Sequence, residues 1–77
     1  MSILFIYRAA RFCPNGVGVD EAIMNAVIRA AEEMLSAETT TVHEDDFPYG
    51  FDALQDRHFD AIIHQCRSKE ALKWLAD

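Results

Sequence analysis

The stretch Ile3-Leu4-Phe5-Ile6-Tyr7 decides the fold of this chain. These five apolar and aromatic residues stand in a row that is too short for a helix and rich in residues that favour strands. Unbroken apolarity, in place of alternation, is typical of a strand whose two faces are both covered. We therefore expect a central strand close to the start of the chain.

An amphipathic helix is predicted after this strand. From Val19 to Leu35 the apolar residues recur at steps of three and one, which places them in a single stripe along a helix. Asp20 is predicted to cap the first turn, where a side-chain oxygen can accept a bond from a free backbone N–H group. The sequence therefore begins with a strand followed by a long helix.

The second half of the chain holds three shorter elements. Residues 39–43 are β-branched and mostly polar, which favours a second strand near a sheet edge. Residues 44–58 contain a Pro-Tyr-Gly turn and room for a single helical turn capped by Asp52. Residues 59–66 predict a third, buried strand, and Ser68 is predicted to cap a last helix.

The order of these elements predicts an α/β fold in one domain, residues 1–77. Two helices and three strands in the order β-α-β-β-α make a two-layer sandwich, most simply with both helices on one face of a three-stranded sheet. In that arrangement the other face of the first strand has no cover within the chain. We therefore expect this face to be buried by self-association into a homodimer.

Cysteine and hydropathy patterns indicate the compartment. Two cysteines, Cys13 and Cys66, are too few for a disulfide scaffold and favour a reducing, cytoplasmic location. The longest apolar run falls far short of the roughly 18–20 residues that span a bilayer. The basic residues Arg8 and Arg11 follow that run, whereas in a secretory signal they would precede it. We expect no contact with a membrane.

The net charge of −6 is concentrated in one part of the chain. Residues 1–31 and 61–77 each carry a net charge of +1, whereas residues 32–60 carry −8. Acidic chains are poor ligands for phosphate backbones, so direct binding of nucleic acid is not expected. A basic surface of a protein partner, such as a nucleic-acid-binding complex, fits this charge instead.

Three aromatic residues lie among the carboxylates of this acidic segment. Aromatic anchors surrounded by charge are typical of binding surfaces. The alternative is that the aromatic residues complete a thin core and the carboxylates only confer solubility. The predicted partner-binding residues are Glu32, Glu33, Glu38, Glu44, Asp45, Asp46, Phe47, Tyr49, Phe51, Asp52, Asp56 and Asp60.

Cys13 offers a second functional hypothesis, a thiol-dependent domain. It lies before the predicted long helix, where backbone N–H groups and the helix dipole lower thiol pKa values. The stretch Cys13-Pro14-Asn15-Gly16-Val17, with Ala30-Ala31 and Glu33, resembles the phosphocysteine loop of fructose-type sugar phosphotransferase IIB domains, which implies a phosphorylated Cys13. Ile6-Tyr7 leading to Cys13-Pro14, with Gly16 in place of a second cysteine, is also similar to monothiol glutaredoxins.

The chain as a whole resembles the small acidic phage-type inhibitors, including anti-CRISPR and anti-restriction proteins. This resemblance is one of size and charge, and it implies a DNA mimic acting in a host cytoplasm. No set of residues typical of catalysis, of a cofactor or of a zinc site is present, although His64 and Cys66 alternate on the predicted third strand. We expect a binding protein, without metal or cofactor, rather than an enzyme.

Overall fold

A three-stranded parallel sheet forms the centre of the molecule. The computed structural model describes residues 1–76. The strands β1 (Ser2–Tyr7), β2 (Glu38–His43) and β3 (Ala61–His64) lie in the order β2-β1-β3, and both pairs are parallel. The predicted α/β class, the three strands and the central position of the first strand are confirmed.

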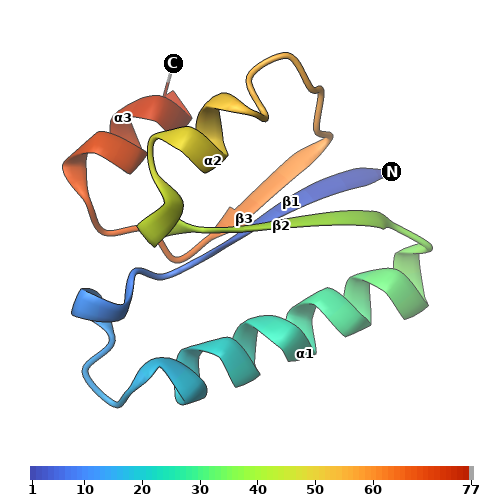
Figure 1. The fold of residues 1–77 in the computed structure, drawn as a ribbon. Coiled ribbons are helices and arrows are strands. Elements are labelled where there is room, and N and C mark those ends of the chain that lie inside the picture. Colours follow the sequence, from blue (N-terminus) through green and yellow to red (C-terminus); the bar gives the residue numbers. More distant parts are fainter. Residues whose placement is uncertain (77) are drawn as a thin grey trace.

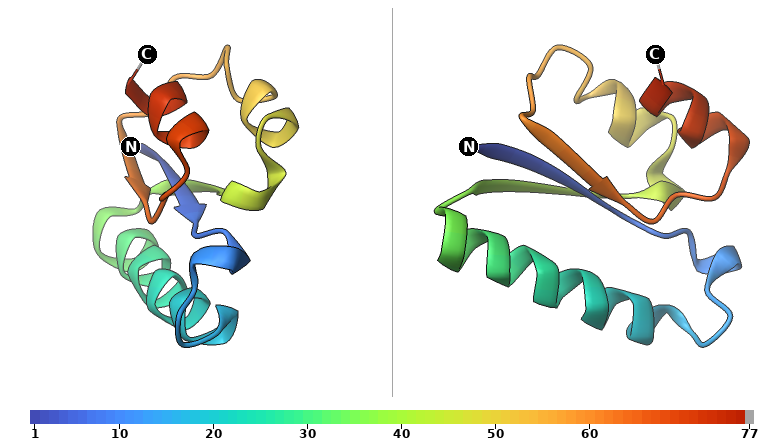
Figure 2. Two further views of the ribbon diagram at one scale, coloured as in Figure 1. Left: turned by 90° about the vertical axis from the view of Figure 1, so that its left-hand side faces the viewer. Right: turned by 180° about the vertical axis from the view of Figure 1, so that it is seen from behind.

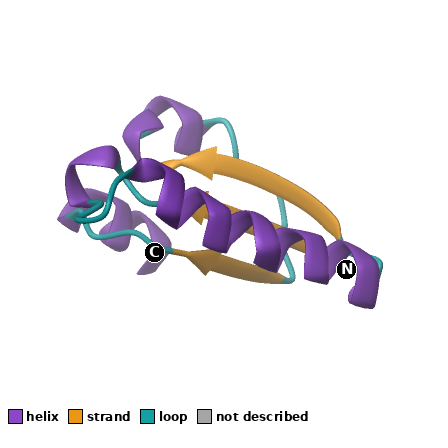
Figure 3. Ribbon diagram, turned by 90° about the horizontal axis from the view of Figure 1, so that it is seen from below, coloured by secondary structure: helices purple, strands orange, loops and turns teal. Residues whose placement is uncertain are grey.

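The helices lie on both faces of this sheet. Figure 1 shows α1 (Val17–Leu35) on one face and α2 (Tyr49–Asp52) with α3 (Lys69–Ala76) on the other, and the views in Figure 2 agree. Seen from below, α1 lies across the sheet (Figure 3). The prediction of both helices on one face was wrong. Parallel crossovers are right-handed, so a chain that passes from β1 to β2 and back across β1 to β3 must place its two connections on opposite faces.

The central strand β1 is therefore covered on both sides. Leu4 and Ile6 pack into a core with Phe51 on the α2 and α3 face, while Ile3 and Phe5 pack into a second core against α1. These four side chains of β1 are all buried. The bare face from which we expected self-association does not exist, because the continuous apolar run supplies two cores at once.

The edge strand β3 differs most from its prediction. It spans four residues and has a single neighbour in the sheet among the described residues, β1. Ile62 and Ile63, predicted to be buried, are 41% and 38% exposed. The cause is the position of β3 at the side of the sheet, which its local sequence does not determine.

The helix ends also differ from the predicted ones. The residue that caps α1 is Gly16, with a φ of 92°, and Asp20 lies inside the first turn. Asp52 is the last residue of α2. Ser68 does cap α3, because its Oγ accepts a hydrogen bond of 3.3 Å from the Ala71 N–H group. Among residues 1–76, no helix combines the length and apolarity needed to cross a bilayer.

Candidate functional site

Residues 45–56 form a short helical segment, here called the acidic cap. It consists of the end of the 3-10 turn η2 (Glu44–Asp46), α2 and the turn that follows. Its inner side chains Phe47, Phe51 and Leu54 pack on the core, with Phe51 edge-on to both Phe47 and Trp74 at ring distances of 5.2 and 5.1 Å. Its exposed side chains include those of Asp45, Asp46, Tyr49, Asp52 and Asp56.

The carboxylates of the acidic cap have no cationic partner among residues 1–76. The ion pairs among these described residues are Arg8 with Asp20 and His58 with Asp60, both at 3.5 Å, and neither involves the acidic cap. Asp45 accepts only a hydrogen bond of 3.0 Å from the backbone N–H group of Ala10, in the loop after β1. The four aspartates of the acidic cap therefore carry negative charge with no cation paired to them, in the same short segment as Tyr49, whose side chain is 85% exposed.

Glu44 is not part of this surface, although its sequence position predicted it to be. Its side chain is only 2% exposed. The carboxylate accepts hydrogen bonds from the backbone N–H groups of Ala9, Arg67 and Ser68, at 2.9, 2.8 and 2.7 Å. Burial acts to raise the pKa of Glu44, but these hydrogen bonds outweigh it and the pKa is lowered. Glu44 therefore joins the ends of the three strands.

Of the three aromatic residues predicted to contact a partner, only Tyr49 is exposed. Phe51 is fully buried and Phe47 is half-buried against the core, so neither is free to contact a partner. This matches the alternative in which aromatic residues complete a thin core. Tyr49 alone remains on the surface, and it lies on the outer side of α2 among the carboxylates.

The remaining predicted residues lie at the opposite end of the sheet. Glu32 and Glu33 are near the end of α1, Glu38 begins β2, and Asp60 precedes β3. The Asp60 carboxylate accepts a 2.7 Å bond from the Ser2 N–H group, which lowers its pKa. Because a strand rises about 3.3 Å per residue, the six residues of β2 place Glu38 roughly 17–20 Å from the residues that follow the strand, whereas Asp60 is only four positions from Asp56.

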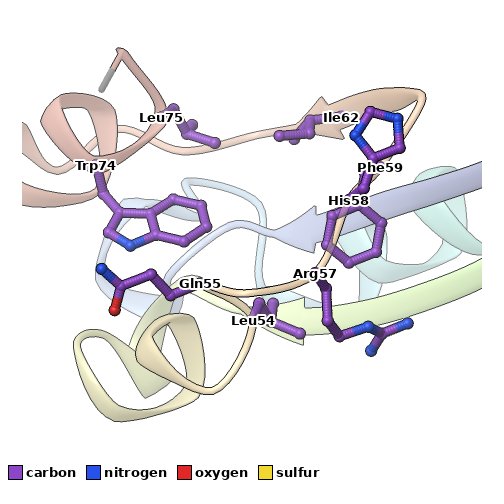
Figure 4. Close-up of a pocket in the computed structure, with 8 residues that line it drawn as sticks. All are labelled: Leu54, Gln55, Arg57, His58, Phe59, Ile62, Trp74 and Leu75. Atoms are coloured by element: carbon purple, nitrogen blue, oxygen red, sulfur yellow. The ribbon is translucent and has the colours of Figure 1, made fainter.

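A cleft of about 490 Å³ lies next to the acidic cap. Figure 4 shows Trp74 and Phe59 on opposite sides of it, with Leu54 below and the Arg57 guanidinium directed away. That guanidinium donates a 3.0 Å hydrogen bond to the Thr40 hydroxyl. The sequence did not indicate this cleft, because its walls come from separate segments. The lining residues are Leu54, Gln55, Arg57, His58, Phe59, Ile62, Trp74 and Leu75.

The environment of Cys13 disfavours a thiolate. The Sγ atom donates to the Ala9 carbonyl at 3.4 Å. Hydrogen bonding to the Asp20 carboxylate, together with desolvation and the negative charge of Asp20, raises the pKa of Cys13. The position before α1 therefore does not activate this thiol, in contrast to the expectation from the helix dipole.

His64 and Cys66 are engaged with each other and with the core. The His64 Nδ1 atom accepts a 3.1 Å bond from the Cys66 N–H group, and burial raises the pKa of Cys66 to about 12. Among the residues that the structure describes, no three His, Cys, Asp or Glu side chains are grouped to hold a metal ion.

Comparison with protein-family models, with curated proteins and with solved structures found no match to this chain.

Proposed function

We propose that this chain is a non-enzymatic binding protein whose acidic cap docks on a basic surface of a protein partner. One observation carries the proposal: Tyr49 is 85% exposed and shares a short segment with four exposed carboxylates that have no cationic partner among the described residues. An exposed tyrosine supplies a large contact area at a low cost in side-chain entropy, and tyrosines are enriched at the centres of interfaces.

The charge of the acidic cap suits a partner that binds nucleic acid. Uncompensated carboxylates attract a basic groove over about one Debye length, roughly 8 Å at physiological salt. A groove occupied in this way is closed to DNA or RNA, so we propose that the chain acts as an inhibitor. The resemblance to small acidic phage-type inhibitors agrees with this proposal, as does the poor affinity expected between an acidic chain and nucleic acid itself.

A pair of triple variants tests the role of the acidic cap. Asp46, Asp52 and Asp56 are changed to Lys in one variant, and Glu32, Glu33 and Glu38 in the other. Both variants bring the net charge from −6 to zero, so they differ only in the location of the change. Proteins recovered from an extract of the source cells at low salt are identified and quantified for the wild type and for each variant.

We expect the cap variant to lose the proteins that the wild type recovers, and the control variant to keep them. Tyr49→Ala is expected to weaken binding by roughly 30-fold, the equivalent of about 2 kcal/mol. The recovered partner should also release a bound oligonucleotide when the wild-type chain is added. Equal recovery by the two triple variants, whether high or low, would contradict a role for the acidic cap.

A further inference from the structure

The two edges of the sheet have opposite character. Along the β2 edge three of the six residues are threonines, and Arg57 crosses to Thr40 with a 3.0 Å hydrogen bond. Along the β3 edge, Ile62 and Ile63 are 41% and 38% exposed on opposite faces of the sheet. Exposed apolar edge strands pair readily with other chains, and polar or charged residues normally prevent this. The β3 edge has no such residue between Ala61 and Ile63.

The helix α1 continues the apolar surface of the β3 edge. Val19, Ile23, Val27 and Met34 recur at helical spacing and are all exposed, Met34 to 81%. Val27 and Met34 line an apolar groove of about 280 Å³ together with Ile63 of β3. This stripe therefore belongs to the side of α1 next to β3, here called the apolar flank.

The opposite flank of α1 is polar and forms hydrogen bonds with β2 and β1. Glu32 accepts a 2.8 Å hydrogen bond from the Thr39 hydroxyl of β2, and Asn25 accepts a hydrogen bond from the Tyr7 hydroxyl. The side of α1 towards β2 is therefore polar and hydrogen-bonded to the sheet, whereas the side towards β3 is apolar and exposed. On the second face of the sheet, Ile62 opens into the cleft between Phe59 and Trp74 (Figure 4).

We propose that a second copy of this chain pairs with the β3 edge and gives a two-fold symmetric dimer. A single added strand would satisfy the backbone of β3 but leave the apolar flank of α1 uncovered, since that flank runs over most of a 19-residue helix. A second copy supplies an edge strand and an apolar helix flank on the same side. An interface of this kind is self-complementary, as a two-fold axis requires.

A two-fold axis that keeps both α1 helices on one face of the sheet fixes the direction of pairing, because it brings the two β3 strands together antiparallel. In the register centred on Ile62, Asp60 lies opposite the partner's His64. The His64 Nδ1 atom accepts a hydrogen bond from the Cys66 N–H group, so the ring hydrogen is on Nε2 and can donate to that carboxylate. With Ile62 opposite the partner's Ile62, each side chain also keeps its own face of the sheet. The result is one continuous six-stranded sheet with β2 at both outer edges.

The dimer is tested by measuring the mass of the full chain in solution. Sedimentation equilibrium at roughly 100 μM, where even a weak dimer is populated, is expected to give about twice the monomer mass of 8.7 kDa. Ile63→Lys is expected to return the mass to that of the monomer. Thr41→Lys, the matched change at the β2 edge, is expected to leave the dimer intact.

Two further measurements keep the test decisive if Ile63→Lys fails to fold. Ile23→Lys changes the apolar flank at an exposed position that lies outside the sheet and is also expected to halve the mass. Amide exchange in residues 61–64 is expected to accelerate when the wild type is diluted. A monomeric wild type at roughly 100 μM would overturn the proposal, as would a dimer that survives both changes. Neither outcome affects the acidic cap, which packs on β2.

Discussion

At the scale of single residues, Glu44 accepts more backbone hydrogen bonds than any other charged side chain described above. Its carboxylate binds three backbone N–H groups from the loop after β1 and the segment before α3. Hydrogen bonds to a charged group are each worth about 1.5–3 kcal/mol, and a buried donor left without its partner costs a similar amount. Glu44 therefore holds together segments that are distant in sequence.

Replacing Glu44 with Gln is expected to lower the free energy of unfolding by about 3 kcal/mol at neutral pH. The folded-state pKa of Glu44 lies below its ordinary value of 4.5. The charged carboxylate therefore stabilises the fold fully above pH 4.5, and this contribution is lost as the pH falls through the lowered pKa. The variant should show a flatter pH dependence in urea unfolding, measured beside the exposed control Glu33→Gln. A variant as stable as the wild type would refute this role.

The Cys13 thiol is expected to react slowly with iodoacetamide near neutral pH. Because its pKa is raised above 9.0, the rate should keep rising with pH through that value. The variant Cys13→Ser is the control, because it retains only the buried Cys66 and therefore gives the rate of that thiol alone. A rate that levels off near pH 7 would instead support the thiol-dependent hypothesis.

At the scale of elements, the acidic cap depends on a close approach of α2 to β2. A Cβ atom on Gly50 would lie 2.9 Å from the Asp46 Cβ and 3.1 Å from the Val42 Cγ2. Gly50→Ala is therefore expected to cost about 1–3 kcal/mol. Gly18→Ala in α1, where a Cβ meets nothing within 4 Å, is expected to gain up to about 1 kcal/mol. Thermal unfolding compares the two variants, and equal melting temperatures would contradict the close packing.

The elements that the sequence predicted well are those set by local patterns. The apolar run of β1 and the stripe of α1 need no information from distant residues, and both elements lie where they were expected. The burial of β3 was predicted wrongly, because Ile62 and Ile63 look the same in a central strand and in an edge strand. The strand order, and with it the placement of the helices on both faces, depends on contacts between distant segments.

At the scale of the whole molecule, the charge distribution could be located along the chain but not in space. The sequence identified the acidic segment, since charge is a property of each residue. It could not show that Glu44 turns inward, because the backbone groups that bind it belong to residues 35, 23 and 24 positions away. Nor could it show that β2 divides the remaining carboxylates between two ends of the sheet.

The two proposed binding surfaces lie on different strands of the sheet. The acidic cap packs on β2, whereas the proposed dimer forms along β3. A dimer therefore carries two acidic caps, one on each half. A partner with two basic sites at a matching separation would be held by both, with an avidity above that of one cap.

The threonine-rich edge of β2 has a consequence for the size of the assembly. Pairing of parallel-sheet edges can in principle continue from copy to copy and produce a filament. In the six-stranded arrangement both outer strands are β2, whose edge carries polar side chains and the Arg57 guanidinium, so a further copy meets a polar edge. In the proposed dimer these polar edges would stop growth after one addition, and they would disfavour aggregation for the same reason.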